Sequence, residues 1–363
     1  MVAFGLASPS TSLVLCNHAL RNSGGIERYA LTLVRGCHAR GIRPTMVAKA
    51  FDATLPEYGW VDPISVRMTG IPGKLRDHWF DWRLRRLKRR HGWFPLVALN
   101  QTGAADIAIC GSNHPAYLAA MGQQAGVADR WKISLERAHL VNSRRIIAHS
   151  ALLAAQVQQH YGIEGSKIEV LYPPVDGDRF SAVNDDERMR LRKSLDLPTD
   201  RAVFLLASTG HRRKGLDLLL SFFRATRLPV LLAVAGRPIA VQDANVRYLG
   251  YRNDIENVFR AVDFTVMASR YEPFGLVGVE SVLCGTPVLA ADGIGCAEIL
   301  RDSAVLRFAV DEPTSLASTV ERALSLWRTS THRLLRPRQG LGYDPSVGAH
   351  LDALLKCVAQ LHP

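Results

Sequence analysis

The sequence of 363 residues lacks any uninterrupted apolar run of eighteen or more residues, so no transmembrane helix is expected. Residues 1–10 lack the basic segment of a secretory signal, and the apolar run at residues 12–16 fits a first β-strand better than a signal core. No two of the six cysteines are spaced as Cys-x-x-Cys, which favours free thiols over disulfides or zinc sites. These absences predict a protein that works inside the cell.

Internal repeats and low-complexity segments are also absent, and 47% of the residues are hydrophobic. A chain of this length and composition predicts two globular domains, each with its own core.

Acidic residues are fewer than basic ones: the sequence has 33 Asp and Glu and 45 Lys and Arg, for a net charge of +12. An excess of that size favours an anionic partner, which could be nucleic acid, an anionic lipid surface or a phosphorylated substrate.

The positive charge is concentrated at residues 74–94, where eight Lys or Arg stand against two Asp. Leu75, Trp79 and Trp82 fall on one face of a helix there, with basic residues around the rest. A basic helix with tryptophans on its apolar side is typical of a segment that lies in an anionic membrane interface. A solvated helix packed on the N-terminal domain explains the pattern equally well. Nucleic-acid binding ranks third, because no helix-turn-helix, zinc-finger or RNA-recognition signature is present.

The most informative stretch is residues 272–280, Glu-Pro-Phe-Gly-Leu-Val-Gly-Val-Glu. A short apolar run precedes it and helical spacing follows Gly275, so it predicts a strand, a glycine turn and a helix. The unpaired N–H groups at such a helix start suit a phosphate, and Glu272 and Glu280 would then hold neutral hydroxyls beside it. An ordinary buried βαβ unit is the plainer interpretation.

A second loop with phosphate-binding character lies at residues 209–215, between a buried strand at 202–208 and a helix that begins at Leu216. Arg213 and Lys214 stand directly before that helix, so they can stabilise a diphosphate without a divalent ion. The pair Gly24-Gly25 before another helix permits close approach to a ligand, and His114 follows a strand end where open α/β sheets bind ligands. Taken alone, each of these last two features is more often structural.

Together these motifs, with Gly285-Thr-Pro-Val and Gly293-x-Gly-x-x-Glu298, resemble the donor-site signature of retaining glycosyltransferases of family 4. The resemblance implies an α/β protein of the GT-B fold: two Rossmann-like domains facing across a cleft, with a C-terminal helix that crosses back. We expect an acceptor-side domain at residues 1–173, joined by the terminal helix at 345–363, and a nucleotide-sugar domain at residues 174–344.

The same resemblance implies roles for individual residues. Arg213 and Lys214 would hold the departing diphosphate, Glu272 the donor sugar's hydroxyls and Glu280 the ribose, while His114 would orient the sugar from the other domain. These make the expected catalytic set Glu272, His114, Arg213 and Lys214. His211 and Arg212 depart from the residues that are commoner in the family, which leaves open which arginine makes the first phosphate contact. The remaining donor-binding residues are expected to be Gly24, Gly25, Arg252, Phe274, Gly275, Leu276, Val277 and Glu280.

The expected reaction moves a hexose, with retention, from a nucleotide sugar, UDP-linked by resemblance, to a cell-envelope glycan or glycolipid such as lipopolysaccharide core. No metal or other cofactor is expected, and Asp176-Gly-Asp178 is discounted as a metal motif because it lies in the hinge. Two alternatives remain: a GT-B nucleotide-sugar epimerase or phosphorylase, and a non-catalytic basic nucleic-acid-binding protein. A cytoplasmic location, at the inner face of the membrane if residues 74–94 bind lipid, completes the expectation.

Overall fold

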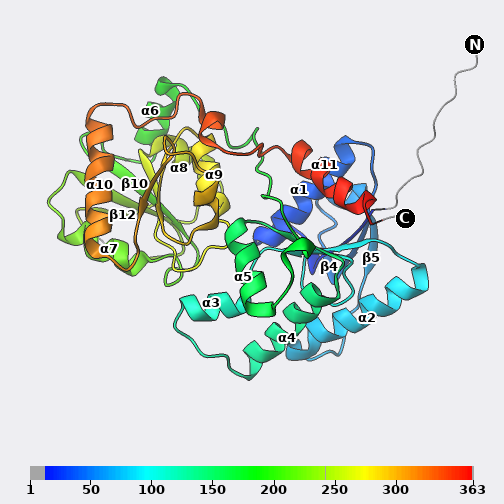
Figure 1. Ribbon diagram of the computed structural model, residues 1–363. Coiled ribbons are helices and arrows are strands. Elements are labelled where there is room, and N and C mark those ends of the chain that lie inside the picture. The colour runs from blue at the N-terminus through cyan, green and yellow to red at the C-terminus, as the bar shows by residue number, and fades with distance from the viewer. Residues whose placement is uncertain (1–12, 242, 362–363) are drawn as a thin grey trace, which may run out of the picture.

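The computed structural model describes residues 13–241 and 243–361, which form two lobes, each built on one parallel β-sheet (Figure 1). Residues 1–12 lie outside the described residues. They include the opening segment, in which no secretory signal is expected, and Ser12, the first residue of the first expected strand. Within the described residues, no helix is long and apolar enough to cross a bilayer.

The N-terminal lobe is organised around a seven-stranded sheet in the order β5-β3-β1-β6-β7-β8-β9. Its strands are β1 (Val14–Cys16), β3 (Thr45–Ala48), β5 (Asp62–Ser65), β6 (Leu96–Ala98), β7 (Ile107–Cys110), β8 (Arg145–Ala148) and β9 (Ile168–Val170). Its helices are α1 (Gly25–Ala39), α2 (Arg76–His91), α3 (His114–Ala120), α4 (Val127–Asn142) and α5 (Ala151–Tyr161), joined by α11 (Val347–Ala359) from the end of the chain. A small parallel pair, β2 (Ala19–Leu20) and β4 (Ala50–Phe51), flanks the sheet.

Both faces of this sheet are buried, as expected for parallel strands covered by helices. Leu15 of β1 belongs to a core shared with α1 and α11, whereas its neighbours Val14 and Cys16 belong to a second core with α2, α4 and α5. The alternation follows from the two-residue period of a strand. The terminal helix α11 therefore completes the core of the lobe in which the chain began, as Figure 1 also shows.

The C-terminal lobe has a six-stranded parallel sheet in the order β12-β11-β10-β13-β14-β15. Its strands are β10 (Ala202–Ser208), β11 (Val230–Gly236), β12 (Val246–Tyr248), β13 (Phe264–Met267), β14 (Val288–Ala291) and β15 (Val305–Phe308). Its helices are α6 (Asp185–Ser194), α7 (Leu216–Ala225), α8 (Ile255–Ala261), α9 (Leu276–Leu283) and α10 (Pro313–Arg328). Short 3₁₀ turns complete the molecule: η1 (Pro56–Trp60), η2 (Gly73–Leu75), η3 (Gly165–Lys167), η4 (Gly295–Glu298) and η5 (Pro337–Gly340).

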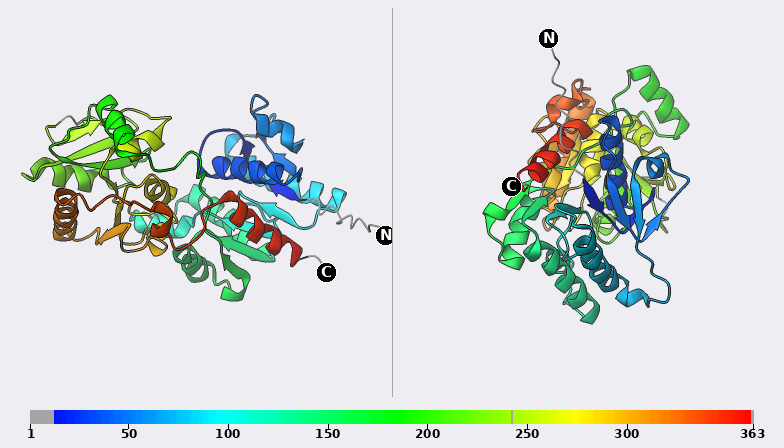
Figure 2. Two further views of the ribbon diagram at one scale, coloured as in Figure 1. Left: turned by 90° about the horizontal axis from the view of Figure 1, so that it is seen from above. Right: turned by 90° about the vertical axis from the view of Figure 1, so that its right-hand side faces the viewer.

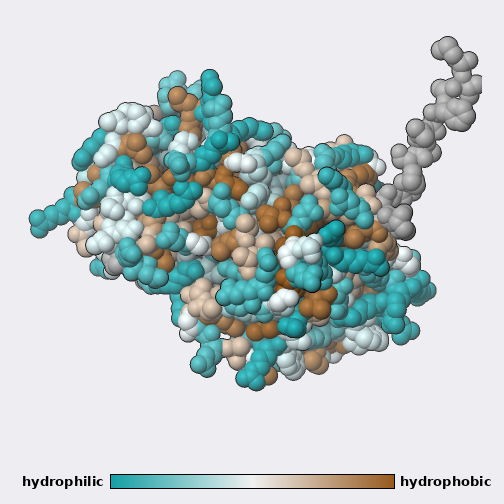
Figure 3. Space-filling model, viewed as in Figure 1, coloured by the Kyte–Doolittle hydropathy of each residue, from teal (hydrophilic) through white to brown (hydrophobic). Residues whose placement is uncertain are grey.

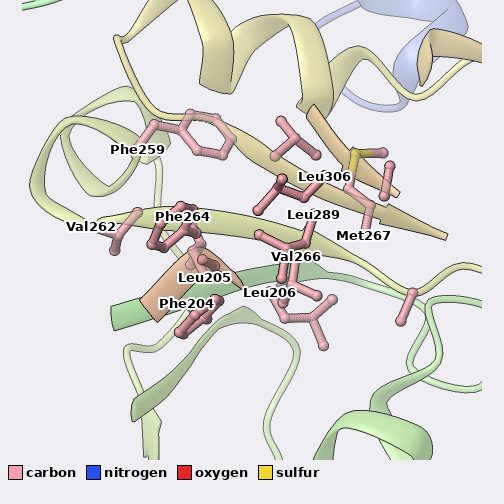
Figure 4. Packing of buried hydrophobic residues seen from close by; sticks show 14 of the residues in the cluster. Phe204, Leu205, Leu206, Phe259, Val262, Phe264, Val266, Met267, Leu289 and Leu306 are labelled. Carbon is pink, nitrogen blue, oxygen red and sulfur yellow. The ribbon is translucent and has the colours of Figure 1, made fainter. Parts of the chain in front are cut away.

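One continuous core fills this second lobe. Figure 4 shows Phe204 of β10 and Phe264 of β13 side by side, and their rings stack with centroids 5.1 Å apart. The two central strands are thus fixed against each other by aromatic packing. This matters for the site, because the loops that follow β10 and β13 carry the two most informative sequence motifs.

The strand order of each sheet reverses next to its first strand. In the C-terminal lobe the chain runs outward from β10 through β11 to β12, and then from β13 through β14 to β15 on the other side. In open α/β sheets such a reversal leaves a crevice at the carboxyl ends of the strands, where ligands bind. In the N-terminal lobe the corresponding reversal lies between β1 and β6.

Two segments of the chain cross between the lobes side by side. The backbone N–H of Val175, on the outward segment, donates to the carbonyl of Pro345 on the returning one at 2.9 Å. The hydroxyl of Tyr343 donates to the carbonyl of Pro173 at 3.0 Å. Seen from above, the lobes lie next to each other with these connections between them (Figure 2).

Candidate active site

A cavity of about 630 Å³ lies between the carboxyl ends of the two sheets and is lined by both lobes. The C-terminal lobe contributes residues that follow β10, β11 and β13, and the N-terminal lobe contributes residues that follow β1, β6, β7 and β8. The cavity is therefore located at both points of strand reversal, which is where the fold itself predicts a ligand.

A carboxylate between two cations forms the centre of the C-terminal wall. Oε2 of Glu272 accepts from Nζ of Lys214 at 2.5 Å and from a guanidinium nitrogen of Arg213 at 2.9 Å. Burial alone would raise the pKa of Glu272, but Lys214 and Arg213 hold it below its ordinary value. Glu272 is thus ionised at neutral pH, and the two cations that could meet a phosphate are already fixed in place.

The loop that carries the cations has one permitted geometry. Gly215, which follows Lys214 and precedes α7, has φ +70°, and a Cβ there would lie 2.0 Å from the carbonyl oxygen of Ala268. Only glycine allows the loop after β10 to pack this closely on the end of β13. The close packing is what brings Lys214 to Glu272, 58 residues further along the chain.

The helix α9 begins inside the cavity. Gly275, at φ +92°, is its N-cap, and a Cβ there would lie 2.7 Å from the methyl carbon of Met267. Gly275, Leu276 and Val277 all line the cavity. Because the first N–H groups of a helix have no carbonyl in a preceding turn, this end of α9 offers hydrogen-bond donors and a positive dipole end to a ligand.

The other expected donor residues of this lobe also line the cavity. Glu280 of α9 is 7% exposed, and burial raises its pKa although Arg28 and Lys214 oppose the rise. Arg252 donates to Oδ2 of Asp254 at 2.7 Å, and Phe274 is buried with its ring 6.0 Å from that of Tyr172. A carboxylate with no hydrogen-bonded cation, such as Glu280, suits ligand hydroxyl groups.

The expected residues of the N-terminal lobe are only partly brought together. Gly25 lines the cavity, but Gly24 does not; it is the N-cap of α1 and packs near the carboxylate of Glu27. His114 does not line the cavity either. Its Nε2 lies 2.9 Å from Oδ1 of Asp129 in the first turn of α4, so the ring of this first residue of α3 turns away toward a neighbouring helix.

Comparisons with known proteins identify the family. Residues 23–179 match the model of Glycosyltransferase Family 4, and residues 187–335 match that of Glycosyl transferases group 1. A probable transglycosylase of Burkholderia thailandensis is 42% identical over 348 residues, which are 95% of this chain and 96% of the relative. The chain belongs to glycosyltransferase family 4.

More distant relatives and solved structures share the fold. A D-inositol 3-phosphate glycosyltransferase of Xylanimonas cellulosilytica is 26% identical over 77% of this chain and 78% of its own. WaaG, a glycosyltransferase involved in lipopolysaccharide biosynthesis, superposes with a TM-score of 0.78 at 18% identity, covering 96% of this chain and 99% of WaaG. Anabaena HepE in complex with UDP and glucose gives a TM-score of 0.74 at 17% identity, covering 97% and 100%. The expected GT-B fold is confirmed.

In this family-4 glycosyltransferase, the N-terminal wall of the cavity contains residues that the sequence did not single out for function. His149 follows β8, Asn100 and Gln101 follow β6, and Glu136 lies on α4. Glu136 is 2% exposed and its pKa is raised by burial; its oxygens accept from Gln101, from the Tyr161 hydroxyl and from the backbone of His114. A histidine that follows a buried strand is the sequence signal that could have identified His149. The same signal underlies the prediction for His114.

The Asp-x-Asp of the hinge is part of a turn in this glycosyltransferase. Oδ1 of Asp176 accepts from the backbone N–H groups of Asp178 and Arg179, both at 3.1 Å. Within residues 13–241 and 243–361, no group of three or more His, Cys, Asp or Glu is arranged to hold a metal ion.

Proposed function

We propose that this glycosyltransferase transfers a hexose from a nucleotide sugar, UDP-linked, to a hydroxyl of a cell-envelope glycan or glycolipid, with lipopolysaccharide core as the favoured acceptor. The observation that carries the proposal is the combination of Arg213, Lys214 and the start of α9 on one wall of the cavity. Two cations and a helix N-terminus around one point are suited to a diphosphate, which is the leaving group of a nucleotide sugar.

In the proposed reaction, the acceptor oxygen bonds to the anomeric carbon while the bond from that carbon to the diphosphate oxygen breaks. The electron pair of the broken bond leaves with the diphosphate, which also takes the acceptor's proton. We propose that negative charge grows beside Arg213, Lys214 and the start of α9, where each cation within about 4 Å contributes on the order of 4 kcal/mol before desolvation, at an effective dielectric near 20. No divalent ion is required for this charge to be stabilised.

Retention by attack on the same face as the leaving group is the proposed stereochemical course. A covalent route would need a free carboxylate as nucleophile. Glu272 is bound by two cations, and the oxygens of Glu136 accept from three donors, so neither is free. The third carboxylate of the cavity, Glu280, has no such partner among the described residues, and we assign it to the nucleotide instead of the anomeric carbon. Glu272 is then proposed to bind the donor sugar's hydroxyls with its remaining lone pairs, and Glu280 the ribose.

The names of the similar proteins support the donor and the acceptor class. HepE has been solved with UDP-glucose, and WaaG is a glycosyltransferase involved in lipopolysaccharide biosynthesis. The name of the Burkholderia relative favours a second candidate, transfer from glycan to glycan without a nucleotide. The cation pair favours the first candidate, since a glycan donor has no diphosphate to stabilise.

We further propose that α2 holds the enzyme at an anionic membrane surface. Phe80 and Leu84 of α2 are fully buried in the N-terminal lobe, yet Trp82 on the same helix is 47% exposed and Trp131 of the adjacent α4 is 44% exposed. Hydrophilic side chains dominate the right-hand edge of Figure 3, where α2 lies. Exposed indoles among basic residues are suited to a lipid interface.

The proposal is tested by thermal shift of the full chain against UDP, GDP and ADP and their glucose conjugates, followed by an assay of nucleotide release. We expect UDP and UDP-sugars to raise the melting temperature in the presence of EDTA, because ligands that bind only the folded state stabilise it. Radiolabel from UDP-sugar should then enter a glycan or glycolipid fraction. Stabilisation by no nucleotide, together with sugar exchange between glycans, would favour the second candidate.

A further inference from the structure

His149 is a buried cavity residue whose side chain has an unpaired nitrogen. It follows β8, lines the cavity and is 6% exposed. Its Nε2 is buried and has no hydrogen-bond partner within the described part of the chain. Buried polar atoms in folded proteins are nearly always paired, so an unpaired one in a cavity wall marks a place where a ligand group belongs.

The ring of His149 is held by its surroundings. Tyr29 of α1 packs edge-on against it, with centroids 5.0 Å apart and planes at 70°. Tyr29 is in turn fixed at its hydroxyl, 2.7 Å from Nε2 of His350 on α11. Because Nδ1 of His350 lies 2.8 Å from the carbonyl of Tyr172, that nitrogen carries the proton and Nε2 accepts from Tyr29. The imidazole is therefore fixed by packing from two helices.

The position of His149 relates it to the donor loop across the cavity. The next residue, Ser150, donates from its hydroxyl to the carbonyl of Pro273 at 2.5 Å. Pro273 lies between Glu272 and Phe274, so the side chain of the residue next to His149 contacts the loop that we propose to hold the donor sugar. His149 is thus near the place where the acceptor hydroxyl must meet that sugar.

Among the described cavity residues, the N-terminal wall around His149 has one cation, Arg28, and one carboxyl group, that of Glu136, whose oxygens already accept from Gln101, Tyr161 and the backbone of His114. Burial and, to a smaller extent, the nearby His350 lower the pKa of His149 to about 3, so its ring is neutral at physiological pH. A second cavity histidine, His139, is 3.1 Å and 3.3 Å from the carbonyls of Thr102 and Ile109 and is also kept neutral by burial. Among the described cavity residues of this lobe, Arg28 at the start of α1 is the one permanent cation. Neutral imidazoles and amides pair with hydroxyls better than with anions.

We infer that His149 hydrogen-bonds a hydroxyl of the acceptor, and that the acceptor unit bound by this wall is an uncharged pyranose, in preference to a phosphorylated or carboxylated sugar. The inference rests on the proposed function, since it assigns the acceptor side of the same cavity. The inference depends on how charge is divided across the cavity. Arg213 and Lys214, which we propose to meet the leaving group, lie on the C-terminal wall, whereas the N-terminal wall has the imidazole of His149, which is uncharged and has an unpaired nitrogen.

The test uses the full chain saturated with UDP and measures binding of methyl pyranosides of glucose, galactose, mannose and N-acetylglucosamine by saturation-transfer NMR, beside glucose 6-phosphate and methyl glucuronide. We expect at least one neutral pyranoside to bind, and to bind more tightly than both charged sugars. His149→Ala should weaken that binding at least tenfold, and His149→Asn should restore part of it. UDP affinity measured by calorimetry should be unchanged in both variants. His160→Ala, on the helix that follows, is the matched control with no expected effect.

Binding of the charged sugars in preference to the neutral ones, or no binding of any neutral pyranoside by a chain that binds UDP, overturns the inference. So does unchanged pyranoside affinity in the His149 variants, or a loss that is confined to UDP-glucose and places the residue at the donor. If His149→Ala does not fold, as judged by its thermal transition, His149→Asn alone decides the result. A wild-type chain that binds no nucleotide instead contradicts the proposed function, and pyranoside binding measured without UDP still tests His149.

Discussion

At the scale of single residues, the main feature is that Glu272 pairs with both Lys214 and Arg213. A buried carboxylate and two cations stabilise one another, and their hydrogen bonds fix the direction of each cation. Because the cations do not have to be reoriented when a ligand arrives, the site is preorganised for the negative charge that develops during transfer.

The first prediction concerns Lys214. Lys214→Ala should lower turnover by about 10²–10³-fold, the loss typical when one preorganised group facing a developing negative charge is removed. The melting temperature should change far less, because Arg213 still pairs with Glu272. Steady-state kinetics beside a thermal transition check this, with Lys193→Ala on α6 as an exposed control. Kinetics equal to wild type would contradict the proposed role.

The sequence predicted the C-terminal wall better than the N-terminal wall for a physical reason. Arg213, Lys214 and Gly275 act within short loops next to their strands, so their location follows from the local pattern of strand, glycine and helix. The orientation of a histidine depends on which helix it meets. His114 and His149 each follow a buried strand, but the first turns toward Asp129 and the second lines the cavity.

At the scale of elements, the packing of α6 on the second sheet depends on one buried carboxylate. Asp263, 1% exposed, accepts from Arg188 and Arg192 of α6 at 2.5 Å and 3.0 Å and lies 3.3 Å from Nε2 of His332. Burial alone would raise the pKa of Asp263, but His332, Arg192 and Arg188 hold it below its ordinary value. The carboxylate is therefore ionised in the folded state and ties the helix to the start of β13.

Replacement of this carboxylate gives the second prediction. Asp263→Asn should lower the free energy of unfolding at pH 7 by about 3–5 kcal/mol, because it leaves buried guanidinium groups without a counter-charge. Since the folded pKa is depressed, the wild-type advantage is complete above the ordinary value of 3.8 and is lost as the pH falls through the lower folded value. Urea unfolding between pH 7 and pH 3 measures the difference. Asp302→Asn, 97% exposed at its side chain, is the control.

The basic helix α2 packs Phe80 and Leu84 on the N-terminal lobe, as one interpretation of residues 74–94 expected, and exposes Trp82 on another side. Its contact with a membrane stays a prediction. The third prediction follows from the exposed side. Trp82→Ala with Trp131→Ala should weaken binding to vesicles of anionic phospholipid by roughly thirtyfold, because each half-buried indole contributes on the order of 1 kcal/mol and the two together about 2 kcal/mol.

Co-sedimentation with vesicles of mixed phosphatidylglycerol and phosphatidylcholine measures that effect. Turnover with a water-soluble acceptor should not change. Leu335→Ala removes a side chain that is 94% exposed on the other lobe and should leave vesicle binding as it is. Equal sedimentation of the double variant and the wild type would exclude this surface as the membrane contact.

Elements that the sequence did not predict share a simple property. The strand β5 consists of Asp-Pro-Ile-Ser at the edge of its sheet, and its side chains are mostly exposed, so it has no apolar run to detect. The strand β6 is fully buried but only three residues long, so its apolar run is too short to detect even though Gly92 and Pro95 mark the turn before it. Long buried strands such as β10 and β11 were predicted because an apolar run of that length is unambiguous.

At the scale of the whole molecule, hydrogen bonds beside the cavity join the two lobes. The hydroxyl of Tyr271 accepts from the N–H of Asn113 at 2.7 Å and donates to its carbonyl at 3.0 Å, and Ser150 donates to Pro273. Glu298 accepts from the first N–H groups of α5, at 2.6 Å from Ala151 and 3.2 Å from Leu152. The last contact places a carboxylate of one lobe at the positive end of a helix in the other.

The fourth prediction uses that contact to separate donor binding from lobe closure. Glu298→Ala should lower turnover about tenfold and increase the radius of gyration in solution scattering, because the lobes lose a charge-assisted link. UDP affinity should stay within about twofold, since the proposed diphosphate and ribose contacts all come from the C-terminal lobe. Glu321→Ala, at an exposed position of α10, is the control. A parallel loss of UDP affinity would instead place Glu298 among the donor contacts.

The return of α11 to the first lobe has a consequence for biosynthesis. Leu351, Leu354 and Cys357 belong to the same core as Leu15 and Val34, so one flank of the first sheet stays bare until the final helix has left the ribosome. At ~5–20 residues per second, the chain between β9 and α11 takes on the order of ten to several tens of seconds to be made. Throughout this interval the apolar residues that α11 will cover are exposed in the nascent chain and can aggregate. A ribosome-associated chaperone that binds apolar segments would protect them.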